Sequence, residues 1–193
     1  MQRVFENTEK TAFLDKGNFE NTKLLESCIA DFVSQLIERP EIIVFGKECK
    51  QQRHVGFFSN NSQGYKYSGK LMPSNELSEN MMELIKIINT MLHADFNGIL
   101  VNKYTDGNDY ISAHSDNENG IDPIGVVSIS FGAERNFRIR NKSDKKIVHE
   151  ENTTHCSILH MGGQFQQLYT HEIPVQKKIK EPRISMTFRK HTI

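Results

Sequence analysis

The segment YISAHSDNE, residues 110–118, places a histidine and a carboxylate where they could bind one metal ion. His114 and Asp116 are two residues apart, so in an extended chain both side chains leave the same face. Two imidazoles and one carboxylate, with open positions for other ligands, form the facial triad that suits ferrous iron in oxygen chemistry. An HxD pair alone is a weak signal, because His and Asp also occur at many turns that bind nothing.

A second histidine would have to come from another part of the chain. Of the eight histidines, His171 is the best placed, because it stands in a β-like run just before Pro174. The predicted metal ligands are therefore His114, Asp116 and His171.

Two arginines near the C-terminus predict what else the metal site would bind. In RISMTFRK, residues 183–190, a side-chain period of two places Arg183 and Arg189 on one face with Ser185 and Thr187. A solvated polar face is one interpretation of this alternation. Buried arginines without partners are costly, however, and a guanidinium binds carboxylate through two parallel hydrogen bonds. Next to a metal in a polar barrel lumen, this face predicts a dicarboxylate site.

Size and composition limit the class of protein. The chain has 193 residues, of which 37% are hydrophobic and 25% charged, as expected for one globular domain. It contains neither an apolar run of membrane-spanning length nor a secretory signal, so we expect an intracellular protein, with nucleus and cytoplasm both open. Cys28, Cys49 and Cys156 are far apart without a CxxC pair, which argues against disulfides and a thiolate zinc site.

The net charge is zero but unevenly distributed. Residues 1–132 contain 12 Lys and Arg against 18 Asp and Glu, and residues 133–193 contain 12 against 6. The C-terminal third therefore carries +6 and the remainder −6. A nucleic-acid-facing surface and an ordinary solvated face both fit this asymmetry.

Two predicted helices precede a series of strands. Apolar residues at helical spacing span residues 24–37, with Asn21 or Thr22 as the N-cap, and a second stripe follows Pro73-Ser74 and spans 77–92. The β-like runs are residues 98–104, 123–132, 136–140, 156–161, 165–173 and 183–189. Helices followed by strands predict an α+β domain, and polar residues on inward faces predict a double-sheet barrel with a polar lumen.

Four stretches together resemble the AlkB family of Fe(II)- and 2-oxoglutarate-dependent dioxygenases. They are NKYTDGNDYISAHSDNE, SISFGAERNF, MGGQFQQLYTH and PRISMTFRK, within a resemblance that covers roughly residues 42–191. The chain is most similar to the branch that repairs alkylated bases in double-stranded DNA. The resemblance implies a jelly-roll (double-stranded β-helix) core with N-terminal helices and a nucleotide-recognition lid.

We expect a single domain over residues 1–193. Residues 1–41 would form an N-terminal segment and helix, residues 42–93 a wedge, the lid and the second helix, and residues 94–193 the catalytic β core.

The resemblance also implies the cofactors and their ligands. The three predicted metal ligands would bind Fe(II), and the reaction would consume O2 and 2-oxoglutarate. Arg183 would bind the distal carboxylate of 2-oxoglutarate, and Arg189 would lie near the metal-proximal end. Ser185 stands where the family commonly has asparagine. The residues assigned to 2-oxoglutarate are Asn102, Tyr104, Arg183, Ser185 and Arg189.

RHVGFF (residues 53–58) and YKYSG (residues 65–69) resemble the lid of the family. Tyr65 and Tyr67 share a face, where flat rings could replace the stacking that a flipped base loses, although a core aromatic pair fits equally well. By resemblance, Tyr67 stacks the base against His114. The substrate contacts assigned in this region are Arg53, Tyr65, Tyr67, Ser68 and Glu118.

The stretch VFGK, residues 44–47, resembles the finger that the duplex-specific branch inserts between bases. An apolar Phe45 could fill the gap left by a flipped nucleotide, although a buried Phe at a strand end explains the residues alone more simply. Lys177 is assigned to a phosphate contact, and Gln176 stands where the resemblance implies an arginine. The other phosphate candidates are Lys142, Lys145, Lys146 and Lys178.

The expected function is oxidative demethylation of bases of the 1-methyladenine and 3-methylcytosine type in DNA, with duplex as the substrate. We expect a monomer that binds no membrane. An RNA demethylase or a single-strand-preferring enzyme is the alternative, and a protein hydroxylase and a non-catalytic nucleic-acid-binding module are more remote. The complete ligand set favours an enzyme, and the tyrosine lid and the wedge favour a base over a protein as substrate.

Overall fold

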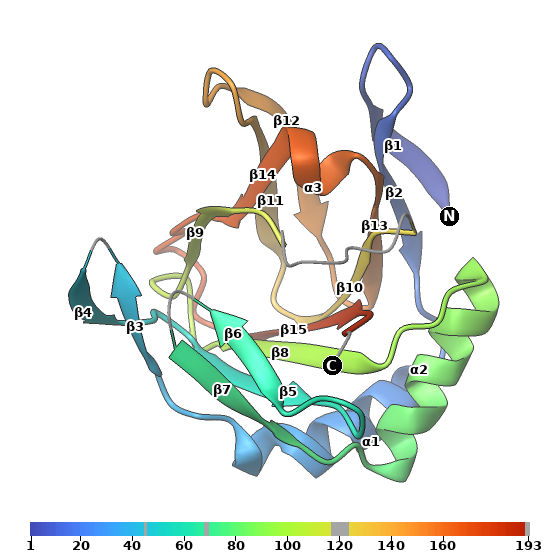
Figure 1. The fold of residues 1–193 in the computed structure, drawn as a ribbon, viewed down its shortest axis with the longest axis vertical. Coiled ribbons are helices and arrows are strands. Elements are labelled where there is room, and N and C mark those ends of the chain that lie inside the picture. Colours follow the sequence, from blue (N-terminus) through green and yellow to red (C-terminus); the bar gives the residue numbers. More distant parts are fainter. Residues whose placement is uncertain (45, 68–69, 117–123, 192–193) are drawn as a thin grey trace.

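A computed structural model describes residues 1–44, 46–67, 70–116 and 124–191 (Figure 1). Phe45, Ser68 and Glu118, to which the sequence assigned substrate contacts, lie outside the described residues. The backbone of Tyr67 is described, but its side chain is not.

Most strands belong to two sheets. The large sheet has nine strands in the order β1-β2-β13-β10-β15-β8-β5-β7-β6, and the small sheet has the order β12-β11-β14-β9. In Figure 1 the small sheet lies over the central strands of the large one, which is the double-sheet arrangement predicted for the core. The strands of the small sheet are β9 (Ile111–His114), β11 (Arg135–Asn141), β12 (Ile147–Thr153) and β14 (Tyr169–Ile173).

The last strand of the chain, β15 (Arg183–Arg189), lies at the centre of the large sheet. β15 pairs antiparallel with β10 on one side and with β8 on the other, so both of its edges are hydrogen-bonded. The remaining strands of the sheet are β1 (Gln2–Glu6), β2 (Ala12–Asn18), β5 (His54–Phe58), β6 (Gly64–Tyr67), β7 (Lys70–Asn75), β8 (Gly98–Tyr104), β10 (Val126–Gly132), β13 (Ser157–Gly163) and β15 (Arg183–Arg189).

Two helices, α1 (Thr22–Phe32) and α2 (Glu79–Leu92), cover the outer face of the large sheet. The Asn21 side chain accepts a hydrogen bond from the Leu24 N–H at 3.2 Å, and Ser78 Oγ accepts one from the Met81 N–H at 3.2 Å. These caps satisfy backbone donors that the first helical turn leaves free. Apolar residues of both helices and of β8, β10 and β15 form one buried cluster.

The first helix ends earlier than the sequence pattern predicts. The α-helix stops at Phe32, a 3-10 turn covers Val33–Gln35, and Ile37 exchanges backbone hydrogen bonds of 2.9 and 3.0 Å with Val55 of β5. The predicted continuation of the helix to Ile37 is therefore wrong, because pairing with the sheet satisfies the backbone there instead. The second helix follows Pro73-Ser74, as predicted, and those two residues belong to β7.

The segment 165–173 is not one strand. Its first four residues form a helical turn, α3 (Phe165–Leu168), and β14 begins only at Tyr169. Gly163, with φ of +62°, redirects the chain before this turn, and the Leu168 N–H then donates to the Gln164 carbonyl at 3.0 Å. The sequence pattern also missed β1, β2 and β12, which extend the edges of the two sheets.

A separate two-stranded hairpin joins the first helix to β5. It consists of β3 (Glu41–Val44) and β4 (Lys47–Lys50), and Val44 pairs with Lys47 across the turn. Figure 1 shows this hairpin projecting from the body of the molecule. None of the described helices is long and apolar enough to cross a membrane.

Candidate metal and co-substrate site

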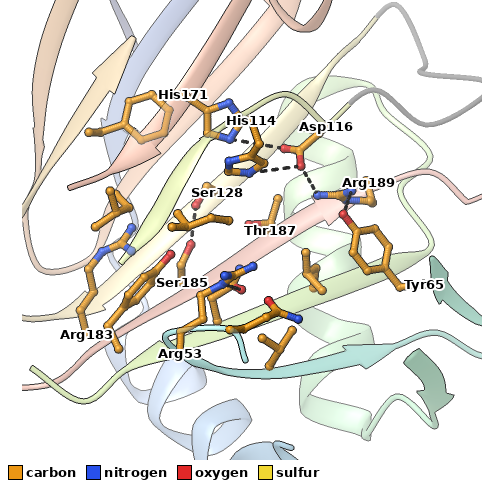
Figure 2. A pocket seen from close by; sticks show the side chains of 18 of the residues that line it. Arg53, Tyr65, His114, Asp116, Ser128, His171, Arg183, Ser185, Thr187 and Arg189 are labelled. Atoms are coloured by element: carbon orange, nitrogen blue, oxygen red, sulfur yellow. Dashed lines mark hydrogen bonds and ion pairs between the residues drawn. The ribbon is translucent and has the colours of Figure 1, made fainter. Parts of the chain in front are cut away.

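The polar face of β15 lines a cavity between the two sheets. Arg183, Ser185, Thr187 and Arg189 all line this cavity, whereas the intervening apolar residues belong to the core beneath the helices. Figure 2 shows the two arginines at opposite sides of the cavity. The predicted alternation of β15 is therefore confirmed, and its polar side faces the interior instead of solvent.

Three candidate metal ligands meet at one end of this cavity. His114 ends β9 and pairs directly with His171 of β14, so sheet register brings together residues that are 57 positions apart. Asp116 lies two residues beyond β9, with its carboxylate oxygens 3.9 Å from His114 Nε2 and 3.6 Å from His171 Nε2. One potential ligand atom from each residue lies within 4.8 Å of the others, which is compact enough for a single ion.

Neighbouring groups orient these ligands. His114 Nδ1 lies 2.9 Å from the Ser112 carbonyl, which favours an N–H there and leaves Nε2 as the ligand atom. The ring of His171 stacks on Phe137, with 5.2 Å between ring centroids. The backbone N–H of Asp116 donates to Gln166 Oε1 at 2.9 Å. Gln166 belongs to the helical turn α3, so this turn, which the sequence pattern predicted as strand, supports a candidate metal ligand.

The charges in the site suit metal binding. Burial lowers the pKa of His171 to about 3 and also lowers the pKa of His114, so both imidazoles are neutral at pH 7. Burial alone would raise the pKa of Asp116, but Arg189 and the two imidazoles together bring it well below its ordinary value. Neutral imidazoles and an ionised carboxylate are the forms that coordinate a divalent ion.

Arg189 holds the carboxylate of the candidate metal ligand Asp116 in place. Its Nη2 donates to Asp116 Oδ1 at 2.8 Å, and its Nη1 donates to the Tyr65 hydroxyl at 3.2 Å. The resemblance assigned Arg189 to the proximal end of 2-oxoglutarate and Tyr65 to the base. The structure places both in the cavity and joins them to each other and, through Arg189, to the metal ligand.

Arg183 occupies a different environment at the far side of the cavity. It is 2% exposed, and its Nη2 donates to Ser130 Oγ at 2.8 Å. Its Nε and Nη1 are buried without a hydrogen-bond acceptor in the described part of the chain. Burial lowers the pKa of Arg183 to about 10, so the guanidinium still carries its charge at pH 7. A buried cation with unused donors fits a bound carboxylate.

The other residues assigned to the co-substrate lie close to Arg183. Asn102 and Tyr104 line the cavity from β8, with the Tyr104 ring centroid 5.3 Å from the Arg183 guanidinium. Asn102 Oδ1 accepts a hydrogen bond of 2.6 Å from Arg53 Nε, which turns its NH2 group away from Arg53. Arg53, assigned to the substrate from the sequence, therefore also orients a residue of the co-substrate end.

Ser185 has a partner within the cavity wall. Its Oγ lies 2.9 Å from Ser128 Oγ on the neighbouring strand β10. Neither Ser128, which lines the cavity, nor Ser130, the partner of Arg183, was predicted, although SISFG alternates polar and apolar residues in the same way as β15 and carried the necessary signal.

A buried arginine outside the cavity also escaped prediction. Arg135 is 1% exposed and donates to the carbonyls of Asp106 and Asp109 and of Pro174, and to Gln176 Oε1. It joins the loop before β9 to the loop after β14, and these two strands carry the histidines. Gln176, which replaces an expected arginine, is therefore part of this internal network.

The lysines proposed for phosphate contacts divide into two groups. Lys142 is half-buried and donates to the Gln166 carbonyl at 2.7 Å, so it supports the cavity wall from outside. Lys177 is exposed in the turn after β14 and remains available to a ligand at the surface. The other exposed candidates are Lys145, Lys146 and Lys178.

A two-sheet barrel with a His-Asp-His group and a buried arginine in its lumen defines a class of metal-dependent oxygenases. The chain belongs to the 2OG-Fe(II) oxygenase superfamily, whose model matches residues 16–189. The enzyme therefore uses Fe(II), 2-oxoglutarate and O2, as the sequence predicted. The donor set and the unused N–H groups of Arg183 fit these two ligands.

Similar proteins refine this assignment. The chain is 28% identical over 192 aligned residues to cattle "DNA oxidative demethylase ALKBH2", covering 90% of this chain and 68% of the relative. The human protein of that name is 30% identical over 155 residues, covering 76% and 59%. These matches confirm the resemblance to AlkB proteins. The chain spans 57% to 68% of the length of its ALKBH2 relatives.

A solved structure supports the fold. "The structure of OsALKBH1" superimposes with a TM-score of 0.60 at 15% identity, covering 92% of this chain and 97% of the other. At that identity the likeness shows the fold alone, and it confirms the predicted α+β class with a jelly-roll core.

Proposed function

We propose that this enzyme removes alkyl groups oxidatively from N-alkylated bases in DNA, with 1-methyladenine and 3-methylcytosine as the expected type of lesion. One observation carries the proposal, namely the His-Asp-His group that shares a cavity with the unused donors of Arg183. Relatives that align with up to 90% of the chain are named DNA oxidative demethylase, and this name supports DNA as the substrate.

The co-substrate end would bind 2-oxoglutarate through its carboxylates. Arg183 offers Nε and Nη1 to the distal carboxylate, while Ser130 holds Nη2 and fixes the plane of the guanidinium. Asn102 offers its NH2 group, because Arg53 already occupies the amide oxygen. These charge-assisted hydrogen bonds would fix the orientation of the co-substrate relative to the metal ligands.

The metal end would hold Fe(II) through His114, Asp116 and His171. Iron supplies the redox chemistry that couples O2 and 2-oxoglutarate to oxidation of the substrate. Arg189 keeps Asp116 ionised and aligned, and the Ser112 carbonyl fixes the His114 ring. The protein thus contributes position and charge to the reaction.

The substrate would place its N-methyl group beside this end of the cavity. The apolar side chains of Val55, Met72, Leu100 and Ile111 line the same cavity and exclude water from the reacting group. The overall reaction converts the N-methyl group, O2 and 2-oxoglutarate into the restored base, formaldehyde, succinate and CO2. The hydroxymethyl group formed on the base releases formaldehyde, and the ring nitrogen keeps the electron pair.

Preference for double-stranded DNA and action as a monomer are finer parts of this proposal. The projecting β3–β4 hairpin supports duplex binding, because the sequence position of Phe45 falls between the paired residues Val44 and Lys47. Exposed Lys177 is available for a phosphate contact.

The test is incubation of the protein with Fe(II), 2-oxoglutarate and oligonucleotides that carry 1-methyladenine or 3-methylcytosine. Single- and double-stranded DNA and RNA of one sequence are compared, and the product masses are measured by mass spectrometry. A mass decrease of one CH2 unit in the DNA, as N–CH3 becomes N–H, supports the proposal if this decrease is fastest for the double-stranded oligonucleotide. Faster loss from RNA or from single strands would favour the alternatives predicted from the sequence. Succinate formation with no change in any oligonucleotide would contradict a nucleic-acid substrate.

A further inference from the structure

Gln51 presents a buried polar atom that has no assigned role. It lies between β4 and β5, is 3% exposed, and lines the metal cavity. Its backbone N–H donates to the Pro40 carbonyl at 3.0 Å, which fixes the position of the residue. Its side-chain Oε1, however, is buried and accepts no hydrogen bond from the described residues. A buried carbonyl without a donor is costly, so its retention calls for a ligand that supplies one.

Gln51 lies where the wall of the metal cavity meets a groove on the surface. Together with Met72 it lines both the metal cavity and a surface groove formed by residues 37–42 and 70–73. This wall includes strand β7 and the start of the β3–β4 hairpin, on the side from which a base would enter under the proposed function. Gln51 is therefore placed to meet the substrate.

The chemistry of the reaction components restricts what Oε1 can bind. At neutral pH, 2-oxoglutarate has only carboxylate and keto oxygens, which accept hydrogen bonds and donate none. Fe(II) has no hydrogen to donate. Adenine and cytosine, by contrast, carry exocyclic amino groups on N6 and N4 with N–H donors. In 1-methyladenine and 3-methylcytosine that amino group is next to the alkylated ring nitrogen.

We propose that Gln51 determines base specificity, with its Oε1 accepting a hydrogen bond from the exocyclic amino group of the flipped base. This inference rests on the proposed function. It follows that bases with an oxygen in place of the amino group are disfavoured, because two acceptors would then face each other. The matched pairs are 3-methylcytosine with 3-methyluracil, and 1-methyladenine with 1-methylhypoxanthine.

The test compares these four bases in one oligonucleotide sequence. Demethylation is followed by mass, and affinity is measured by fluorescence anisotropy with 2-oxoglutarate present and iron omitted. Gln51→Met keeps the shape of the side chain without the acceptor, and Gln51→Glu keeps an acceptor at either amide position. Gln52→Met is the matched control, because Gln52 is bonded to Arg39 and Lys50 and does not line the cavity.

We expect Gln51→Met to lower kcat/KM and affinity for the two amino-bearing bases about tenfold, the effect of one lost hydrogen bond, with little change for the two oxo bases. Gln51→Glu and Gln52→Met should keep the preference for amino-bearing bases. Equal effects of Gln51→Met on all four bases, or loss of the preference in Gln51→Glu, would overturn the inference and leave demethylation standing. A parent enzyme that demethylates none of the four would overturn the proposed function as well.

Discussion

Strand β15, which lines the metal and co-substrate cavity, and the β3–β4 hairpin, which is assigned to the DNA, are built under opposite conditions. All seven residues of β15 are buried and both of its edges are paired, whereas all four residues of β4 are exposed in a sheet of only two strands. Both arginines of β15 have partners within the fold, Ser130 for Arg183 and Asp116 for Arg189, and these bonds fix their geometry before any ligand binds. The hairpin is exposed to solvent, and its carboxylates Glu41 and Glu48 pair with a single side chain of the body, Lys70 of β7.

This difference in burial separates the residues that would carry out the reaction from those that would select the substrate. A change in the residues that hold the metal or the co-substrate should impair turnover of every substrate alike, because all substrates use the same metal and co-substrate. A change in the hairpin should instead alter the ratio between substrates. Experiments that compare substrates can therefore test the division directly.

Removal of a metal ligand should have the largest effect. Asp116→Ala, and likewise His114→Ala and His171→Ala, should abolish turnover on all substrates while circular dichroism shows a folded domain, since two ligands do not hold ferrous iron. Asp116 is the one carboxylate among the described residues that line the cavity. Iron content and product mass check the result. Asp95→Ala, at an exposed site paired with Lys190, is the control, and full turnover by any ligand variant would refute the metal assignment.

Arg183 should affect the co-substrate and not the metal. Arg183→Ala should retain iron but raise the KM and Kd for 2-oxoglutarate about 10- to 100-fold, the range for lost hydrogen bonds to a charged group. Arg183→Lys should bind with intermediate affinity, because an ammonium cannot form the two parallel bonds of a guanidinium. Titration calorimetry measures both affinities. If Arg183→Lys matches the parent, the distal carboxylate does not depend on paired bonds at this position.

Arg189 distinguishes the two ends of β15. Because it donates to Asp116, Arg189→Met should lower iron affinity about tenfold, a usual effect of losing a group that orients a metal ligand. The KM for 2-oxoglutarate should change less, in contrast to Arg183→Ala. Arg189→Lys should restore part of the iron affinity. A rise in KM as large as that of Arg183→Ala would show that Arg189 binds the co-substrate directly, as the resemblance implied.

The residues that line the cavity were more predictable from the sequence than the contacts that hold them in place. The alternation of β15 and the HxD pair are local patterns with a fixed chemical meaning, so they indicated the ligands. The contact of Arg189 with Asp116 joins residues 73 positions apart, and that of Arg53 with Asn102 joins residues 49 apart. Nothing local in the sequence specifies such pairs, because sheet register creates them.

The errors in the fold have a similar cause. Apolar spacing predicted a helix up to Ile37, but Val55 offers that residue a backbone partner in the sheet. Likewise, residues 165–168 were predicted as the start of the following strand but form one helical turn, which brings Gln166 to Asp116. Tertiary contacts decide such short segments, and intrinsic propensity does not.

The hairpin provides the prediction with the smallest effect on chemistry and the clearest contrast between substrates. Extruding a base from a duplex costs a few kcal/mol of stacking and pairing, and an inserted Phe45 ring would offset part of that cost by filling the vacancy. A single strand has no such gap. Phe45→Ala should therefore lower kcat/KM for a lesion in double-stranded DNA about tenfold more than for the same lesion in a single strand, with 2-oxoglutarate turnover unchanged.

The control for Phe45 is a residue that should weaken binding without choosing between paired and unpaired lesions. Lys177 is exposed, and loss of one phosphate contact should lower affinity across sequences and reduce the slope of log K against log salt by about 0.9 on duplex DNA. Lys177→Ala should thus change the salt dependence, and Phe45→Ala should not. Equal losses on duplex and single strand for Phe45→Ala would indicate a packing role for the ring. The hairpin would then belong with β15 as part of the scaffold, and substrate choice would have to be sought in the lid strands β6 and β7.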